Sequence, residues 1–423
     1  MRDMTRTPRS LLPYACVVGI VLLSVMITDY YFWATTGTQS LLVPPDYSIT
    51  WSQALQALRG HPLHVYAGSP LAGALPALPW LLAAVASGLI HMGVVPAHYG
   101  AQHAPIPWSA LMWPLYVIGA LSVLGVHRLL VALDVPWSRH RAMLVIYSVL
   151  VAVPTLALAG HPEDLATLGL LCWAVALGKE GRWSGGAAVM LAAVLLQDYA
   201  AVAVPIYLAC SPAGQRVRVA AITMVPTGAL GLALLVGGGS NARLAMLDQP
   251  TPYKGQHTVS HYIDPSMMLR PEWRGTLERY TAGGHGRSLT IVLGVALAIW
   301  LWRRGGTWLD GCWAIGVALA SRGLTDPTVW TYYMAPGLIV LAILAMRCDS
   351  PDRRAGAVAL AALPLIVLAP DYIAKTIAVP WPIWMVGYAS CWMGLAGLAR
   401  PWAATTATMS DGRQVVDAEA IRA

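Results

Sequence analysis

Charged side chains are scarce in this sequence: only 11% of the 423 residues are Asp, Glu, Lys or Arg, whereas 57% are hydrophobic. Soluble domains contain roughly 25% charged residues, so this composition excludes an ordinary soluble globular protein. Long apolar runs recur from end to end, and they do not alternate with polar residues at every second position. Because continuous apolar runs are typical of membrane-spanning helices, we predict an all-α polytopic membrane protein.

Other absences exclude further classes of protein. The six cysteines form no CxxC pair, so neither a zinc ribbon nor a disulfide framework is predicted. No GxxxxGK[ST] frame occurs, which leaves no signal for a nucleotide site. No internal repeat of 20–50 residues is evident either. The sequence therefore predicts one membrane domain without a nucleotide cofactor.

The net charge of +7 comes mostly from Lys and Arg in short gaps between apolar runs. That distribution follows the positive-inside rule of membrane proteins and does not indicate a nucleic-acid partner. We predict a plasma-membrane protein with about 10–12 transmembrane helices and both termini in the cytoplasm.

The predicted transmembrane domain covers residues 1–400, and residues 401–423 are predicted to be a disordered cytoplasmic tail. Two segments are predicted on the extracytoplasmic face, a first loop over residues 35–72 and a long loop over residues 238–287. Residues 73–95 are broken by Pro76 and Pro79 and are expected to form a short pair of half-helices or a re-entrant hairpin. Residues 185–211 have basic flanks on both sides and are expected to form a hairpin that bends near Gln197-Asp198. A true span is the alternative for either stretch.

Under this topology, ionisable residues gather at the outer ends of the spans. Such residues are costly at membrane depth and tend to be functional. Transfer of a sugar from a lipid phosphate requires a carboxylate that takes the proton of the attacking hydroxyl, and cations that hold the phosphate. The outer face supplies both, with acids at Asp29, Asp46, Glu163, Asp164 and Asp326 and basic groups that include Arg322, Lys254, Arg270, His61, His161 and His257.

Three motifs resemble one known family. The first-loop segment Asp46-Tyr47-Ser48-Ile49-Thr50-Trp51, followed by Ala54, Ala57, Gly60 and Tyr66, resembles the first-loop signature of polyprenol-phosphate-mannose-dependent mannosyltransferases of the GT-C class. Gly160-His161-Pro162-Glu163-Asp164 is similar to the polar outer turn of that family. Its late outer turn is similar to Arg322-Gly323-Leu324-Thr325-Asp326-Pro327, with Trp330, Tyr332 and Tyr333. The family often has Lys in the bent hairpin and Gln or Asn in the polar turn, where this chain has Gln197-Asp198 and His161 with Asp164.

The resemblance implies a GT-C-like bundle, inversion at the sugar carbon and no metal or other cofactor. It further implies a polyprenyl-phosphate donor, mannose as the sugar, and a glycolipid or lipid-anchored glycan as acceptor, with Asp46 as general base. We expect Arg322, Lys254 and Arg270 to bind the donor phosphate. Further substrate contacts are expected from Asp29, His61, Tyr66, His161, Glu163, Asp164, His257, Asp326, Tyr332 and Tyr333.

Each of these residues also has a structural interpretation. Asp46 is a suitable helix N-cap, and Pro162-Glu163-Asp164 is a good helix start without any catalytic role. Tyr332 and Tyr333 fit an aromatic belt at the membrane surface. For the whole chain, a lipid or solute transporter or flippase is the main alternative. A non-catalytic homologue that assists the assembly of other membrane proteins is a third hypothesis.

Overall fold

A computed structural model of the chain describes residues 18–19, 21–23, 26–27, 45–67, 77–94, 116–156, 161–247, 284–325, 331–366 and 381–401. Every regular element in these ranges is a helix, which confirms the all-α prediction for the described residues. The five described cysteines are free thiols.

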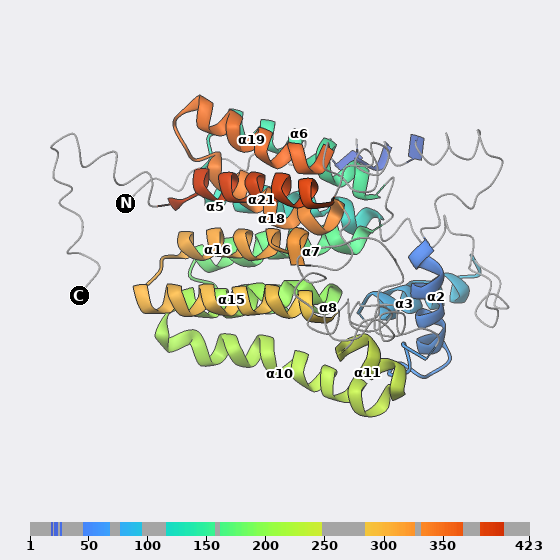
Figure 1. Cartoon of the computed structure of the whole chain (residues 1–423). Coiled ribbons are helices and arrows are strands. Elements are labelled where there is room, and N and C mark those ends of the chain that lie inside the picture. The colour runs from blue at the N-terminus through green and yellow to red at the C-terminus, as the bar shows by residue number, and fades with distance from the viewer. Residues whose placement is uncertain are drawn as a thin grey trace, which may run out of the picture.

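The long helices form a bundle in which the axes of α10, α15, α16, α19 and α21 are roughly parallel or antiparallel to one another, whereas α2, α3 and α11 gather at one end (Figure 1). The elements of the bundle, in chain order, are α5 (Ser122–Ala132), α6 (Trp137–Tyr147), the π-helical turn η3 (Ser148–Ala152), α7 (Pro162–Lys179), α8 (Trp183–Leu196), the 3-10 turn η5 (Asp198–Val202), α9 (Ala203–Cys210), α10 (Ala213–Gly237), α15 (Gly284–Arg304), α16 (Trp308–Ala320), α17 (Arg322–Thr325), α18 (Thr331–Ala345), α19 (Pro351–Ile366) and α21 (Trp381–Leu398). The elements at the end are α2 (Pro45–Leu58), α3 (Ala77–His91) and α11 (Gly239–Leu247).

Helix α7 lies in the core of the bundle, where it packs against α5 and α8. Glycines allow the close approach of α5 and α7. A Cβ at Gly125 would lie 2.6 Å from the Cα of Gly169, and a Cβ at Gly169 would lie 2.6 Å from the Cα of Ser122. Because this contact has no room for a methyl group, the two backbones are in direct contact, and α5 fixes the position of α7.

One predicted hairpin is wrong and the other is confirmed. Residues Ala77–His91 form a single helix, α3, in which Pro79 lies in the first turn. Proline is tolerated there because the first N–H groups of a helix have no intrahelical acceptor. In the second hairpin, α8 ends at Leu196, and Gln197 is extended. The chain then returns through η5 and α9, so that the hydroxyl of Tyr207 donates to the carbonyl of Trp183 at 3.3 Å.

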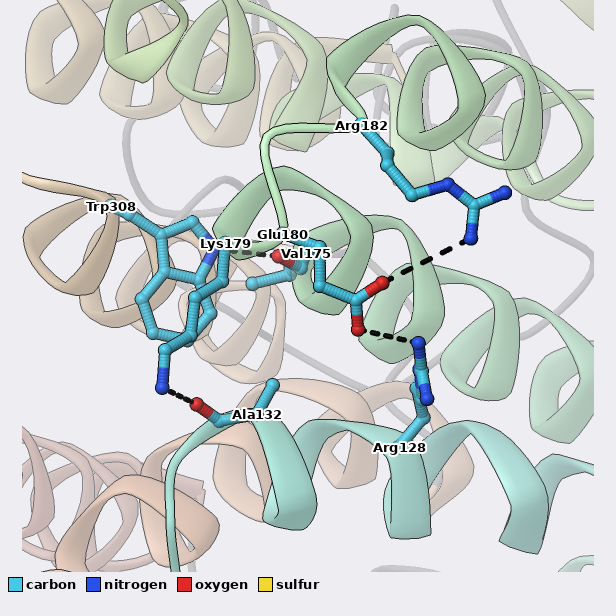
Figure 2. Close-up of polar contacts among 7 residues, drawn as sticks. All are labelled: Arg128, Ala132, Val175, Lys179, Glu180, Arg182 and Trp308. Atoms are coloured by element: carbon cyan, nitrogen blue, oxygen red, sulfur yellow. Dashed lines mark hydrogen bonds and ion pairs between the residues drawn. The ribbon is translucent and has the colours of Figure 1, made fainter. Parts of the chain in front are cut away.

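The end of the bundle at which α7 finishes is rich in basic side chains (Figure 2). Arg128 on α5 forms an ion pair with Glu180 at 2.5 Å, and the Lys179 ammonium donates to the carbonyl of Ala132. The indole of Trp308, at the start of α16, donates to the carbonyl of Val175 at 2.5 Å. These contacts tie the ends of α5, α7 and α16 together on the side that the sequence predicts to be cytoplasmic.

Among the described residues, α10 is the one helix long and apolar enough to cross a membrane. Shorter apolar helices of 10–17 residues accompany it, at Ala77–His91, Tyr116–Ala132, Trp183–Leu196, Asp198–Cys210, Tyr333–Ala345 and Ile383–Leu398. The described part of the chain is therefore a helical bundle. The predicted long loop over 238–287 is helical where it is described, because α11 and the start of α15 fall within it.

Candidate functional site

Three potential ligand or acid–base groups meet at the start of α7. His161 precedes the helix, Pro162 is its first residue, and Glu163 and Asp164 stand in the first turn. The Nδ1 of His161 lies 2.7 Å from Oε1 of Glu163 and 3.9 Å from Oδ2 of Asp164. The side chains are 16%, 7% and 2% exposed in that order, so the chain holds two adjacent carboxyl groups away from solvent.

The carboxyl group of Asp164 is the most deeply buried of the three. Neither of its oxygens accepts a hydrogen bond from the described residues. It does not cap the helix, since the start of α7 has no side-chain cap hydrogen bond. An ionised carboxylate is expensive to bury. Buried carboxyl groups of this kind are candidates for a functional site.

Arg322 lies against two aromatic rings. Its guanidinium carbon lies 4.2 Å from the ring centroid of Tyr199 and 4.3 Å from that of Tyr333, and the residue is 4% exposed. These two cation–π contacts hold the guanidinium in place.

Arg322, Asp198 and the α7 group form one electrostatic cluster. Asp164 interacts with the charges of Glu163, His161, Arg322 and Asp198. The hydroxyl of Tyr199 donates to the backbone carbonyl of Asp164 at 3.4 Å, which links η5 to α7. Helices α7, α8, α17 and α18 and the turn η5 thus bring these residues together from distant parts of the sequence.

The first loop reaches the same cluster through Tyr66. This tyrosine is buried against the end of α10 and against α11, in a small apolar core with Val65 and Leu234. Burial raises the pKa of the Tyr66 phenol above its usual range, and the neighbouring Asp198 carboxylate raises it further. The loop is fixed by the indole of Trp80, which donates to the carbonyl of Pro62 at 2.8 Å.

The predicted site residues fall into three groups. His161, Glu163, Asp164, Arg322, Tyr333 and Tyr66 lie in or beside the cluster. His61 does not: it is exposed, and its ring stacks on that of His64 with centroids 5.5 Å apart. Asp46 lies in the first turn of α2, one residue after its start, and Tyr332 lies in α18, but their side chains are outside the described part of the chain, as are all of Asp29, Lys254, His257, Arg270 and Asp326.

Sequence reasoning missed Tyr199. The polar Gln197-Asp198-Tyr199 interrupts an apolar run, and this interruption predicts the bend of the hairpin. The same interruption places polar side chains at one end of the bundle. The partner of the bend, however, is Arg322, more than a hundred residues later in the chain, and no local pattern predicts that pairing.

Comparison of the chain with protein-family models, with curated proteins and with solved structures gives no match. The chemistry of the cluster is therefore argued from its groups alone. Glu163 and Asp164 can accept a proton or coordinate a cation, His161 can do either, and the Arg322 guanidinium can hold an anionic oxygen.

Proposed function

We propose that this protein is an integral-membrane glycosyltransferase that moves a sugar, mannose on the resemblance of its motifs, from a polyprenyl phosphate to a glycolipid or lipid-anchored glycan. The observation that carries the proposal is the buried group of carboxyl residues and one arginine at a single end of the helical bundle. Two of the three motifs with the family resemblance, at 160–164 and 322–327, supply Asp164 and Arg322, which interact electrostatically.

The surface of the bundle supports a bilayer environment. Large apolar side chains are exposed along α10 and α15, among them Val217, Val236, Ile291 and Val292. Contiguous apolar surface of this kind marks membrane or protein contacts in ordinary proteins. The basic residues around Lys179 lie about 22 Å along α7 from Asp164, because fifteen residues of helix rise by about 1.5 Å each. The basic end and the acidic group thus lie at opposite ends of α7, as the positive-inside rule predicts for a cytoplasmic end and an extracytoplasmic site.

In the proposed reaction, an acceptor hydroxyl attacks the sugar C1. The Asp46 carboxylate takes the hydroxyl proton as the new C1–O bond forms. The bond from C1 to the phosphate oxygen breaks, and its electron pair leaves with the polyprenyl phosphate. Arg322, in contact with Tyr199 and Tyr333, would stabilise the charge that develops on that phosphate. Lys254 and Arg270 from the long loop would contribute further positive charge.

The test uses membranes that contain the full-length chain and a radiolabelled polyprenyl-phosphate mannose, followed by lipid extraction. We expect a labelled glycolipid from the wild type and none from Asp46→Asn at equal protein level. Asp349→Asn is the matched control, because Asp349 is a fully exposed acid on the basic side, 3.7 Å from Arg139. The control should make product at the wild-type rate.

Two outcomes would overturn parts of the proposal. If Asp46→Asn makes product at the wild-type rate, Asp46 is not the base. If no acceptor extract consumes the sugar lipid, the transporter or flippase hypothesis replaces the enzyme. A transporter would then bind or move the lipid without cleaving the C1–O bond.

A further inference from the structure

The ligand atoms at the start of α7 are spaced as they would be around one metal ion. One ligand atom each from His161, Glu163 and Asp164 can be chosen so that all lie within 4.8 Å of one another. A zinc-type ion with bonds of about 2.1 Å and tetrahedral angles holds its ligand atoms about 3.4 Å apart. The separations from His161 Nδ1, 2.7 Å to Glu163 Oε1 and 3.9 Å to Asp164 Oδ2, fall on either side of that value. Small rotations of two carboxyl groups would equalise them.

The carboxyl group of Asp164, whose oxygens accept no hydrogen bond from the described residues, is an independent indication of a ligand. Its residue is 2% exposed, and both oxygens lack a hydrogen-bond donor among the described residues. Buried polar atoms in folded proteins almost always have a partner. A cation bound between Asp164, Glu163 and His161 would supply one to each carboxylate.

The charge of the cluster points the same way. Asp164 interacts with two further acids, Glu163 and Asp198, and with one arginine, Arg322. A cation bound beside the Asp164 carboxyl group would be attracted by the nearby carboxylates.

We propose that His161, Glu163 and Asp164 bind a divalent first-row metal ion of the Mn²⁺ or Zn²⁺ type. One imidazole nitrogen with two carboxylates suits these ions, whereas Mg²⁺ and Ca²⁺ take oxygen ligands almost without exception. Three protein ligands leave at least one coordination position for water or a phosphate oxygen. The site departs from the metal-independent chemistry that the family resemblance implies, and the two residues in which the polar turn differs from the family pattern, His161 and Asp164, are ligands here.

The competing interpretation is a proton-mediated contact, in which His161 donates to Glu163 and no metal binds. The two interpretations differ in a direct measurement. A metal site takes up one ion per chain, and the uptake depends on Asp164. If His161 only donates a hydrogen bond to Glu163, the chain takes up no metal ion and Asp164 has no effect on uptake.

The experiment measures metal binding and does not involve the sugar donor, so its failure leaves the proposed glycosyl transfer untouched. The detergent-purified full-length chain is treated with chelator, desalted and titrated with Mn²⁺, and the free ion is followed by electron paramagnetic resonance. We expect about one Mn²⁺ per chain, displaced by Zn²⁺ but not by an equal concentration of Mg²⁺ or Ca²⁺.

The variants are Asp164→Asn and Glu163→Gln, with Asp349→Asn as the control. Loss of a second-shell partner already weakens metal affinity by about 10–100-fold, and loss of a ligand should weaken it at least as much. Size-exclusion profiles identical to the wild type would show that each variant is folded. No stoichiometric uptake by the wild type would overturn the proposal, and so would wild-type affinity in both folded ligand variants.

Discussion

Substitution of Gly125 tests whether α5 fixes the position of α7. A methyl group at this residue would clash with the carbonyl oxygen of Gly169 and lie 2.6 Å from its Cα. Two carbon atoms are at their best separation at about 3.5–4.0 Å, so α5 and α7 must move apart by at least about 1 Å in Gly125→Ala. A gap of that size forfeits a quarter to a half of the dispersion energy of the atoms involved. Overpacking of this kind destabilises proteins by about 1–3 kcal/mol.

Alanine also favours helix over glycine by up to about 1 kcal/mol, so a control must carry the same gain. Gly228 provides it. This residue lies within α10, and a Cβ there meets nothing within 4 Å. The difference between Gly125→Ala and Gly228→Ala therefore isolates the packing cost at the α5–α7 contact.

The assay is thermal unfolding of the purified protein in detergent. An unfolding entropy of about 2.1 cal/mol/K per residue over 423 residues gives a shift of about 1 °C for each kcal/mol. The midpoint of Gly125→Ala should therefore lie about 1–3 °C below that of Gly228→Ala. Gly169→Ala should behave alike, because its Cβ would lie 2.6 Å from the Cα of Ser122. The double variant should lose less than the sum, since one separation of the helices relieves both clashes. Equal midpoints for Gly125→Ala and Gly228→Ala would refute the close-contact argument.

Three further predictions concern the site and its surroundings. Gly119→Ala should lower glycolipid formation at unchanged protein level, because its Cβ would lie 3.1 Å from the Cα of Pro162 and displace the start of α7; a rate equal to the wild type contradicts this. Arg322→Lys keeps the charge but loses the guanidinium contact with the rings of Tyr199 and Tyr333. It should destabilise the chain by about 1–2 kcal/mol in thermal unfolding and reduce transfer more than tenfold. Transfer at the wild-type rate would show that Arg322 does not bind the donor. Thr307→Ala removes a capping box with Asp310 and should cost about 1 kcal/mol of stability, while transfer stays at the wild-type rate because the cap lies on the basic side of the bundle.

Local patterns in the sequence predicted those parts of the fold that depend on local chemistry. The start of α7 at Pro162 and the bend at Gln197 both follow from residue types that favour a helix start or interrupt an apolar run. The prediction of a break within residues 73–95 was wrong because Pro79 falls in a first turn, where its missing N–H has no consequence. A sequence pattern alone does not reveal at which turn of a helix a proline will fall.

The arrangement of the site depends on tertiary packing and was only partly predictable. Glu163 and Asp164 are neighbours in sequence, so the sequence predicts their proximity. The contact of Tyr199 and Tyr333 with Arg322 depends on how α17, α18 and η5 cross. No periodicity encodes a crossing between segments that are separated by more than a hundred residues.

The helix dipole does not account for the buried carboxyl group of Asp164. A negative charge in the first turn of a helix gains about 0.3–1 kcal/mol at the surface and at most about 2 kcal/mol when partly buried. Removal of a carboxylate from water costs several kcal/mol, and Asp164 recovers none of it through hydrogen bonds from the described residues. An ionised Asp164 therefore depends on nearby positive charge, which comes from Arg322 and from a protonated His161. Without metal, Asp164→Asn should therefore unfold at a higher temperature than the wild type, and saturating Mn²⁺ should reverse that order. Identical behaviour of the two proteins in chelator and in Mn²⁺ would mean that Asp164 is buried in its neutral form and that no cation compensates it.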